Sequence, residues 1–116
     1  MLLCISAQPL PAQDSLILDS LENIARFFAV DIALCANKSD DALIWIGITT
    51  HKRFSDQKLI EYYQLRFSEM LAEYSTDAMA SKAQNGGVQF LGRQLTAKNC
   101  SEIEEARASM MRNLTR

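Results

Sequence analysis

The sequence has few of the side chains from which catalytic and metal sites are built. It contains one histidine, His51, and three cysteines that lie too far apart for any C-x-x-C spacing. Zinc sites and dithiol redox motifs need closely spaced cysteine or histidine ligands, so we expect no metal site. The pair Gly86-Gly87 lacks the third glycine and the Lys-Ser/Thr pair of phosphate-binding loops. The sequence therefore predicts no cofactor and no catalytic residue.

The sequence also lacks a strong excess of one charge and any long apolar run. Its 12 Lys and Arg residues are spread along a chain with 14 Asp and Glu residues, and the net charge is -2. A surface that binds nucleic acid usually gathers basic residues, and a membrane-spanning helix needs about 20 apolar residues in succession. An odd number of cysteines is more typical of thiols in a reducing compartment than of a disulfide framework. We therefore expect a cytoplasmic protein with no nucleic-acid partner and no membrane partner.

The start of the chain, MLLCISA, is apolar but is not typical of a signal peptide. No basic residue precedes the apolar run, and the run is shorter than the usual hydrophobic region of such a peptide. Pro9 and Pro11 then interrupt regular structure, because proline fixes φ and removes a backbone donor. We expect residues 1–13 to form an N-terminal arm or a short strand of a single domain that spans residues 1–116.

Three segments have the apolar spacing of amphipathic helices. The first begins at a cap on Asp14 or Ser15, and the second begins at Ser55 or Asp56 and runs to residue 82. The third begins with the capping box SEIE, in which a serine is followed three positions later by a glutamate. The apolar positions are Ile17, Leu21, Ile24 and Phe28 in the first helix, Ile60, Tyr63, Phe67, Met70 and Tyr74 in the second, and Ile103, Ala106, Met110 and Leu114 in the third.

Three further segments have the pattern of β-strands. Apolar side chains alternate in residues 30–35, and residues 42–50 are apolar on both faces of an extended chain. The polar turn NKSDD separates these two segments, and a third strand is expected at residues 88–95, where Gly92 marks a bulge or bend. The predicted fold class is α+β: an antiparallel sheet of about three to five strands packed against a long central helix, with N- and C-terminal helices.

The apolar side chains exceed what such a sheet needs to bury. We interpret the excess as a surface for self-association together with a patch for another chain, although an ordinary core would also account for it. The candidate client-binding residues are Phe27, Phe28, Leu43 and Trp45. The candidate dimer-interface residues are Leu59, Tyr62, Tyr63, Leu65 and Phe67.

The order of the predicted elements resembles that of the class I type III secretion chaperones. The segment VQFLGRQLTAKNCSEIEEARASMMRNL is similar to the C-terminal strand, loop and helix of that family, and DSLENIARFF is similar to its opening helix. In the family a hairpin precedes the last helix, whereas one strand is predicted here. The resemblance implies a small acidic cytosolic dimer that binds the N-terminal segment of a secreted effector.

The leading hypothesis is a non-enzymatic protein-binding protein, a small dimeric secretion chaperone or adaptor that binds one client protein. One alternative is an inhibitor or immunity-type protein that blocks a toxin or nuclease with an acidic face. A further alternative is an enzyme in which His51 activates Cys35 or Cys100 as a nucleophile.

Overall fold

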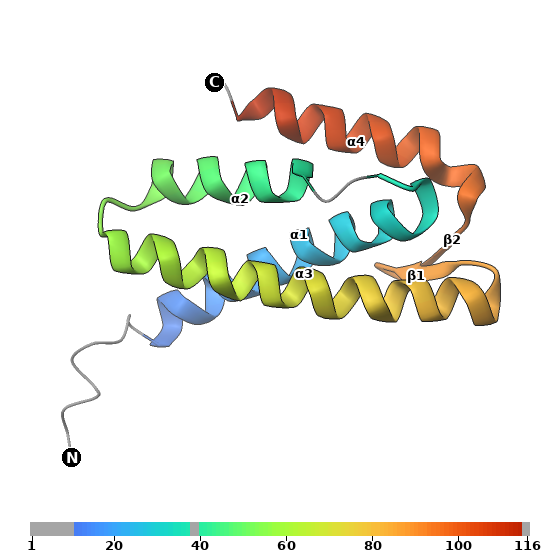
Figure 1. The fold of residues 1–116 in the computed structure, drawn as a ribbon, viewed down its shortest axis with the longest axis horizontal. Helices are drawn as coiled ribbons and strands as arrows, with labels where there is room; N and C mark the ends of the chain where they lie inside the picture. Colours follow the sequence, from blue (N-terminus) through green and yellow to red (C-terminus); the bar gives the residue numbers. More distant parts are fainter. Residues whose placement is uncertain (1–10, 38–39, 115–116) are drawn as a thin grey trace, which may run out of the picture.

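The computed structural model describes residues 11–37 and 40–114, and most of them are helical (Figure 1). The predicted N-terminal arm, residues 1–13, lies outside the described residues, except that residues 11–13 already belong to the first helix. In chain order the elements are α1 (Pro11–Cys35), α2 (Asp40–Arg53), α3 (Gln57–Asn85), β1 (Val88–Phe90), β2 (Arg93–Leu95), the short 3-10 helix η2 (Ala97–Asn99) and α4 (Cys100–Asn113).

The predicted α+β fold with a sheet of three to five strands is wrong. Residues 30–35 continue α1, residues 42–50 lie within α2, and the described part of the chain holds only a two-stranded antiparallel sheet. Both apolar runs are too short for their periodicity to distinguish a strand from a buried helix. In α2 the buried residues are Ala42, Ile46 and Thr50, and this spacing of four is that of one helix face.

Helix α2 forms although its sequence, LIWIGITT, is rich in β-branched residues. The Thr49 hydroxyl donates to the Trp45 carbonyl at 2.8 Å, and the Thr50 hydroxyl donates to the Ile46 carbonyl at 2.6 Å, so both hydroxyls are satisfied within the helix. Two aspartates lie in its first turn and basic side chains lie in its last turn, an arrangement that complements the helix dipole. Packing on α3 and these end charges outweigh the weak helix propensity of the segment.

The predicted long helix is present as α3. Its N-cap is Asp56, one of the two candidates, whose carboxylate accepts the Lys58 amide at 2.9 Å. The helix ends at Gly86, which takes the left-handed φ of 69° and donates its amide to the Lys82 carbonyl. A residue with a side chain is strained in this conformation, so the glycine fixes where the helix stops.

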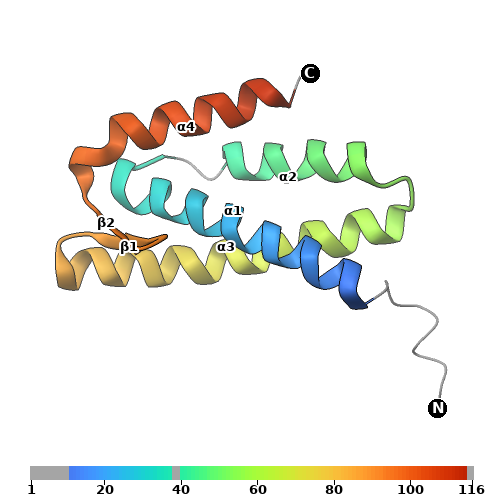
Figure 2. The ribbon, with the colours of Figure 1, turned by 180° about the vertical axis from the view of Figure 1, so that it is seen from behind.

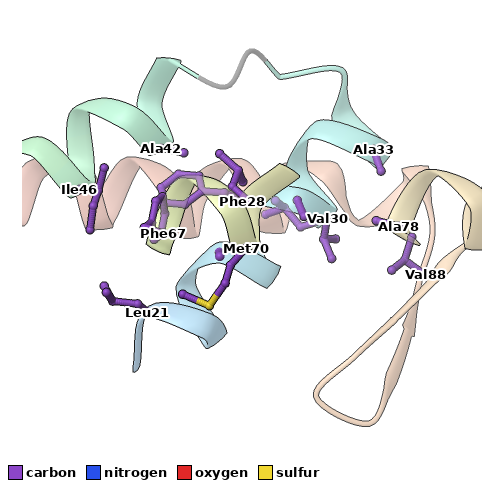
Figure 3. Packing of buried hydrophobic residues seen from close by; sticks show 14 of the residues in the cluster. Leu21, Phe28, Val30, Ala33, Ala42, Ile46, Phe67, Met70, Ala78 and Val88 are labelled. Atoms are coloured by element: carbon purple, nitrogen blue, oxygen red, sulfur yellow. The ribbon is translucent and has the colours of Figure 1, made fainter. Parts of the chain in front are cut away.

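Helix α3 is the support on which the other two long elements pack. Figures 1 and 2 show α1 running along α3, and α2 lying beside the first half of α3. Phe28 of α1 and Phe67 of α3 lie next to each other in the core, with Ala42 of α2 above them and Ile46 of α2 to the side, as Figure 3 shows. The core continues along α1 and α3 to Val88 of the hairpin.

The predicted strand 88–95 is a hairpin rather than a single strand. Val88 pairs with Leu95 in antiparallel register, and Leu91 and Gly92 form the turn with φ values of 48° and 79°. Two successive positive φ angles are typical of the tight turns that match strand twist, so Gly92 serves as a turn residue and not as a bulge. The predicted capping box at Ser101 is also wrong, because the reciprocal cap is made at Thr96 and the chain is already helical from Cys100.

Helix α4 is fastened to the end of α1 by a disulfide between Cys35 and Cys100, whose Cα atoms are 5.5 Å apart. The expectation of free thiols is therefore wrong for these two cysteines, and the third, Cys4, lies outside the described residues. The hairpin turns the chain back from the end of α3 to the end of α1, and this brings together two cysteines separated by 65 positions. Spacing in the sequence does not reveal such a pairing.

Candidate functional site

A cleft of about 610 Å³ opens between α1, α2 and the beginning of α3, and we call it the Trp45 groove. Both α1 and α2 pack mainly on α3, which leaves room between them. The volume lies in the range of roughly 300–1,000 Å³ that is common for binding pockets. The lining residues are Ile17, Ser20, Leu21, Asn23 and Ile24 of α1, Trp45, Thr49, Thr50, Lys52 and Arg53 of α2, then Phe54 and Tyr63.

Trp45 is the central aromatic side chain of this groove. Its ring lies 5.7 Å from that of Phe67 and 6.5 Å from that of Phe28, so one side of the indole rests on the core. The residue is nevertheless only half-buried, because the groove exposes part of it. A tryptophan whose ring packs on the core at one side and is exposed at the other can contact a partner with little loss of side-chain entropy.

Tyr63 lines the groove from the α3 side. Its ring stacks on Phe54 with 5.1 Å between the ring centres, and its hydroxyl donates to an Asp14 carboxylate oxygen at 2.7 Å. Burial first, and then the hydrogen bond to Asp14, raise the pKa of Tyr63 above its ordinary range. Tyr63 is therefore a neutral hydrogen-bond donor that ties the start of α1 to α3.

The edge of the groove at the end of α2 is basic. Lys52 donates to the carbonyl of Leu114, and the Arg53 guanidinium lies 5.8 Å from the ring centre of Phe54. Ser20 and Asn23 add polar groups on the α1 side. The groove thus combines an apolar floor with a positively charged edge.

The structure does not bring the four candidate client-binding residues to one surface. Trp45 lines the groove and Phe28 lies buried beneath it. Phe27 points to the hairpin, where its ring lies 6.3 Å from that of Phe90, and Leu43 is exposed on another side of α2. Sequence reasoning missed Ile17, Leu21, Ile24 and Phe54 as groove residues, although the first three were recognised as one apolar helix stripe.

The candidate dimer-interface residues divide between the core and the surface. Tyr63 and Phe67 are buried in the monomer and are not available to a partner. Leu59 is partly buried against the core, whereas Tyr62 and Leu65 are exposed. Only Tyr62 and Leu65 are exposed, as residues of a dimer interface must be in the monomer.

A buried ionic cluster joins α1, α2 and α4. The Asp31 carboxylate accepts the Arg107 guanidinium at 2.7 and 2.9 Å and the Asn37 side-chain amide at 2.7 Å. Arg107 also lies 3.2 Å from the Asp41 carboxylate. Each buried polar group of the cluster has a partner, so the arrangement is that of a structural clamp.

A second hollow, of about 430 Å³, lies between α1, α3 and the hairpin. Arg26 crosses it, 3.1 Å from the Glu22 carboxylate and 4.3 Å from the ring centre of Tyr74. Burial, followed by the hydrogen bond with Glu22, raises the pKa of Tyr74. Glu22, Arg26 and Tyr74 are thus occupied with one another, which makes this hollow a poorer binding site than the Trp45 groove.

The residues of the Cys/His alternative are separated. Cys35 and Cys100 are bonded to each other beside the start of α2, whereas His51 lies in its last turn, where Nδ1 is 2.8 Å from the Gly47 carbonyl. The described residues contain no group of three or more His, Cys, Asp or Glu side chains that could hold a metal ion. Within 11–37 and 40–114, no helix is long and apolar enough to cross a membrane.

Comparison with known proteins found no matching family model, no matching curated protein and no matching solved structure. The resemblance to type III secretion chaperones was based on the order of predicted elements. That order is not the observed one, because residues 30–35 and 42–50 are helical where strands were predicted.

Proposed function

We propose that the protein is a non-enzymatic binding protein that holds one client protein through the Trp45 groove. The observation that supports the proposal most directly is Trp45 itself, which is supported by two core rings and open to the groove. Tryptophan is among the residues that most often dominate the free energy of binding in protein interfaces.

The chemistry of the groove indicates the kind of segment that the client would present. Ile17, Leu21, Ile24 and Phe54 offer an apolar surface wide enough for one or two large side chains. The basic edge at the end of α2 favours acidic residues next to that apolar anchor. The expected client segment is therefore an apolar side chain flanked by Asp or Glu. An inhibitor of a nuclease would instead need a basic partner, so the charge of the captured protein distinguishes the two functions.

A capture experiment compares three forms of the protein as bait in native extract. Trp45→Ala should lose the captured client, whereas Leu65→Ala, which truncates an apolar side chain 59% exposed on α3, should retain it. Ile46→Ala is a stability control, because Ile46 lies on the buried face of α2 and its truncation lowers the free energy of unfolding by roughly 2–5 kcal/mol. A client retained by folded Trp45→Ala, or lost from all three variants alike, would contradict the assignment of the groove.

The cytoplasmic location remains a prediction, and the disulfide argues against it. A Cys35–Cys100 bond persists more readily in an oxidising compartment than in the cytosol. Trapping of free thiols in intact cells, followed by mass spectrometry, measures which state is present. A secretion-chaperone role in the cytosol requires the reduced pair, whereas an adaptor outside the cytosol requires the disulfide.

A further inference from the structure

One side of α2 carries apolar residues that this chain does not bury. Leu43 is 47% exposed, Ile44 is 48% exposed and Ile48 is 38% exposed, although all lie in the middle of a well-formed helix. The core-facing residues of α2 lie on the opposite side of the helix, and Trp45 faces the groove. We call the exposed side the outer face of α2 and define it by Asp40, Leu43, Ile44, Gly47, Ile48 and His51.

Gly47 lies at the middle of the outer face. A glycine inside a helix costs roughly 0.5–1 kcal/mol relative to alanine. Within the described residues nothing requires a glycine at this position, because a Cβ at Gly47 would meet no atom within 4 Å. The gap makes a shallow groove with Ile44, Ile48 and His51, the shape into which side chains of a second helix can fit.

The charges of α2 are opposite at its two ends. Asp40 and Asp41 lie in the first turn, and the last turn is basic. Asp41 is already paired with Arg107, but Asp40 makes no ion pair within the described residues. Gly47 lies within one residue of the midpoint between Ile44 and Ile48, so turning the helix end over end about that midpoint exchanges its acidic and basic ends.

We propose that a second copy of this chain covers the outer face, with the two α2 helices antiparallel and a two-fold axis near Gly47. Ile44 then lies opposite Ile48 of the second copy, and each pair occurs twice. Asp40 lies opposite the basic last turn, also twice, whereas a parallel arrangement would set Asp40 against Asp40. The proposal is independent of the client-binding function, because it uses another side of α2.

Analytical ultracentrifugation of the purified chain tests the dimer directly. Cys4 is changed to serine in every form, so that this third cysteine cannot link two copies. One helix face is a small interface, so we expect a dimer that dissociates over roughly 1–200 μM. Gly47→Leu and Ile48→Glu should each weaken association by about tenfold or more while the melting temperature of the monomer is retained. Leu65→Glu, at a more exposed site on α3, should leave association unchanged.

An exchange of charges tests the antiparallel orientation. Asp40→Lys and Lys52→Glu should each weaken self-association, because Lys52 borders the shallow groove with Ile44 and Ile48, and each change places like charges together at both ends of the pair. An equimolar mixture of the two variants should recover dimers of mixed composition, since both ends are then complementary. Recovery by mixing Asp40→Lys with the unchanged chain instead would show a parallel pair and overturn the proposal.

A protein that stays monomeric at every concentration would also overturn the proposal. So would a dimer that dissociates in Leu65→Glu but persists in Gly47→Leu. These measurements use the protein without a client. Failure of the dimer therefore leaves the Trp45 groove standing, and failure of client capture leaves the dimer standing.

Discussion

Removal of the Arg107 charge should destabilise the protein more than the loss of any exposed ion pair. Asp31 is fully buried, and among the described residues Arg107 is its one charged partner, across the contact between α1 and α4. Arg107→Met retains the apolar stem and length of the side chain but leaves the Asp31 carboxylate with the Asn37 amide alone. A buried charge without a counter-ion is far less stable than a buried ion pair.

The expected loss can be estimated from the geometry. Breaking a buried ion pair by removing one partner costs roughly 3–5 kcal/mol. The Arg107 side chain is 19% exposed, so water reaches the site and the lower value, about 3 kcal/mol, is expected. In a chain of this size that loss lowers the melting temperature by roughly 10–15 °C.

A double-mutant cycle supplies the control. Asp31→Asn keeps the shape of the side chain and its hydrogen bond to Asn37 but removes the charge. In Asp31→Asn/Arg107→Met no charge remains buried, so the double variant should recover at least half of the stability that Arg107→Met loses. Urea unfolding at neutral pH, followed by the fluorescence of Trp45, measures all four forms. A loss below about 1 kcal/mol for Arg107→Met, or strictly additive losses in the double variant, would refute the reasoning.

Three other measurements follow from the fold. Replacement of Cys35 and Cys100 by serine should lower the free energy of unfolding by about 4 kcal/mol, because the bond closes a loop across 65 positions, while far-UV circular dichroism stays unchanged. Gly47→Ala should stabilise the dilute monomer by roughly 0.5–1 kcal/mol, whereas Gly86→Ala should cost about 1 kcal/mol because its φ of 69° is left-handed; chemical denaturation that gives the same sign for both would contradict the assigned roles. Because the folded pKa of Tyr63 lies above its ordinary value of 10.0, its neutral form contributes stability that is present below pH 10 and lost as the pH rises further, and Tyr63→Phe should flatten that decline in melting temperature.

The helices that the sequence predicted are those whose local signals agree with their packing. In α3 the cap at Asp56, the apolar stripe and the stop at Gly86 all indicate one long helix. In α1 the stripe from Ile17 to Phe28 marks the side that lies on α3. Such segments need no information from distant parts of the chain, because a single buried stripe repeats along the whole element.

Helix α2 was mistaken for a strand because its apolar residues do not form one stripe. Isoleucine favours strands, and an isoleucine at every second position suggests one face of a sheet. The buried face of α2 instead includes Thr50, a polar residue whose hydroxyl accepts from the Gln64 amide at 3.0 Å. No local pattern reveals that this threonine belongs to the core, because Gln64, the donor to its hydroxyl oxygen, lies on α3.

The disulfide and the ionic cluster were out of reach of the sequence for the same reason. Cys35 meets Cys100, and Asp31 meets Arg107 across 76 positions, only after the hairpin has turned α4 back over the end of α1. The chain has three cysteines, and an odd count favours the prediction of free thiols. Long-range pairs of this kind depend on the topology of the fold, and the predicted topology was wrong because two helical segments were predicted as strands.

The helical state of α2 also changes how its excess of apolar residues is explained. A strand has two faces, so the apolar residues of 42–50 would divide between one core side and one free side. A helix divides them among three directions: Ile46 enters the core, Trp45 borders the groove, and Ile44 and Ile48 remain exposed. The Ile46 side and one side of the Trp45 ring pack on the core, whereas Ile44 and Ile48 make no such contribution. Exposed isoleucine contributes nothing to folding and favours aggregation, so two further apolar directions on one short helix are the pattern expected of a protein that binds partners on both.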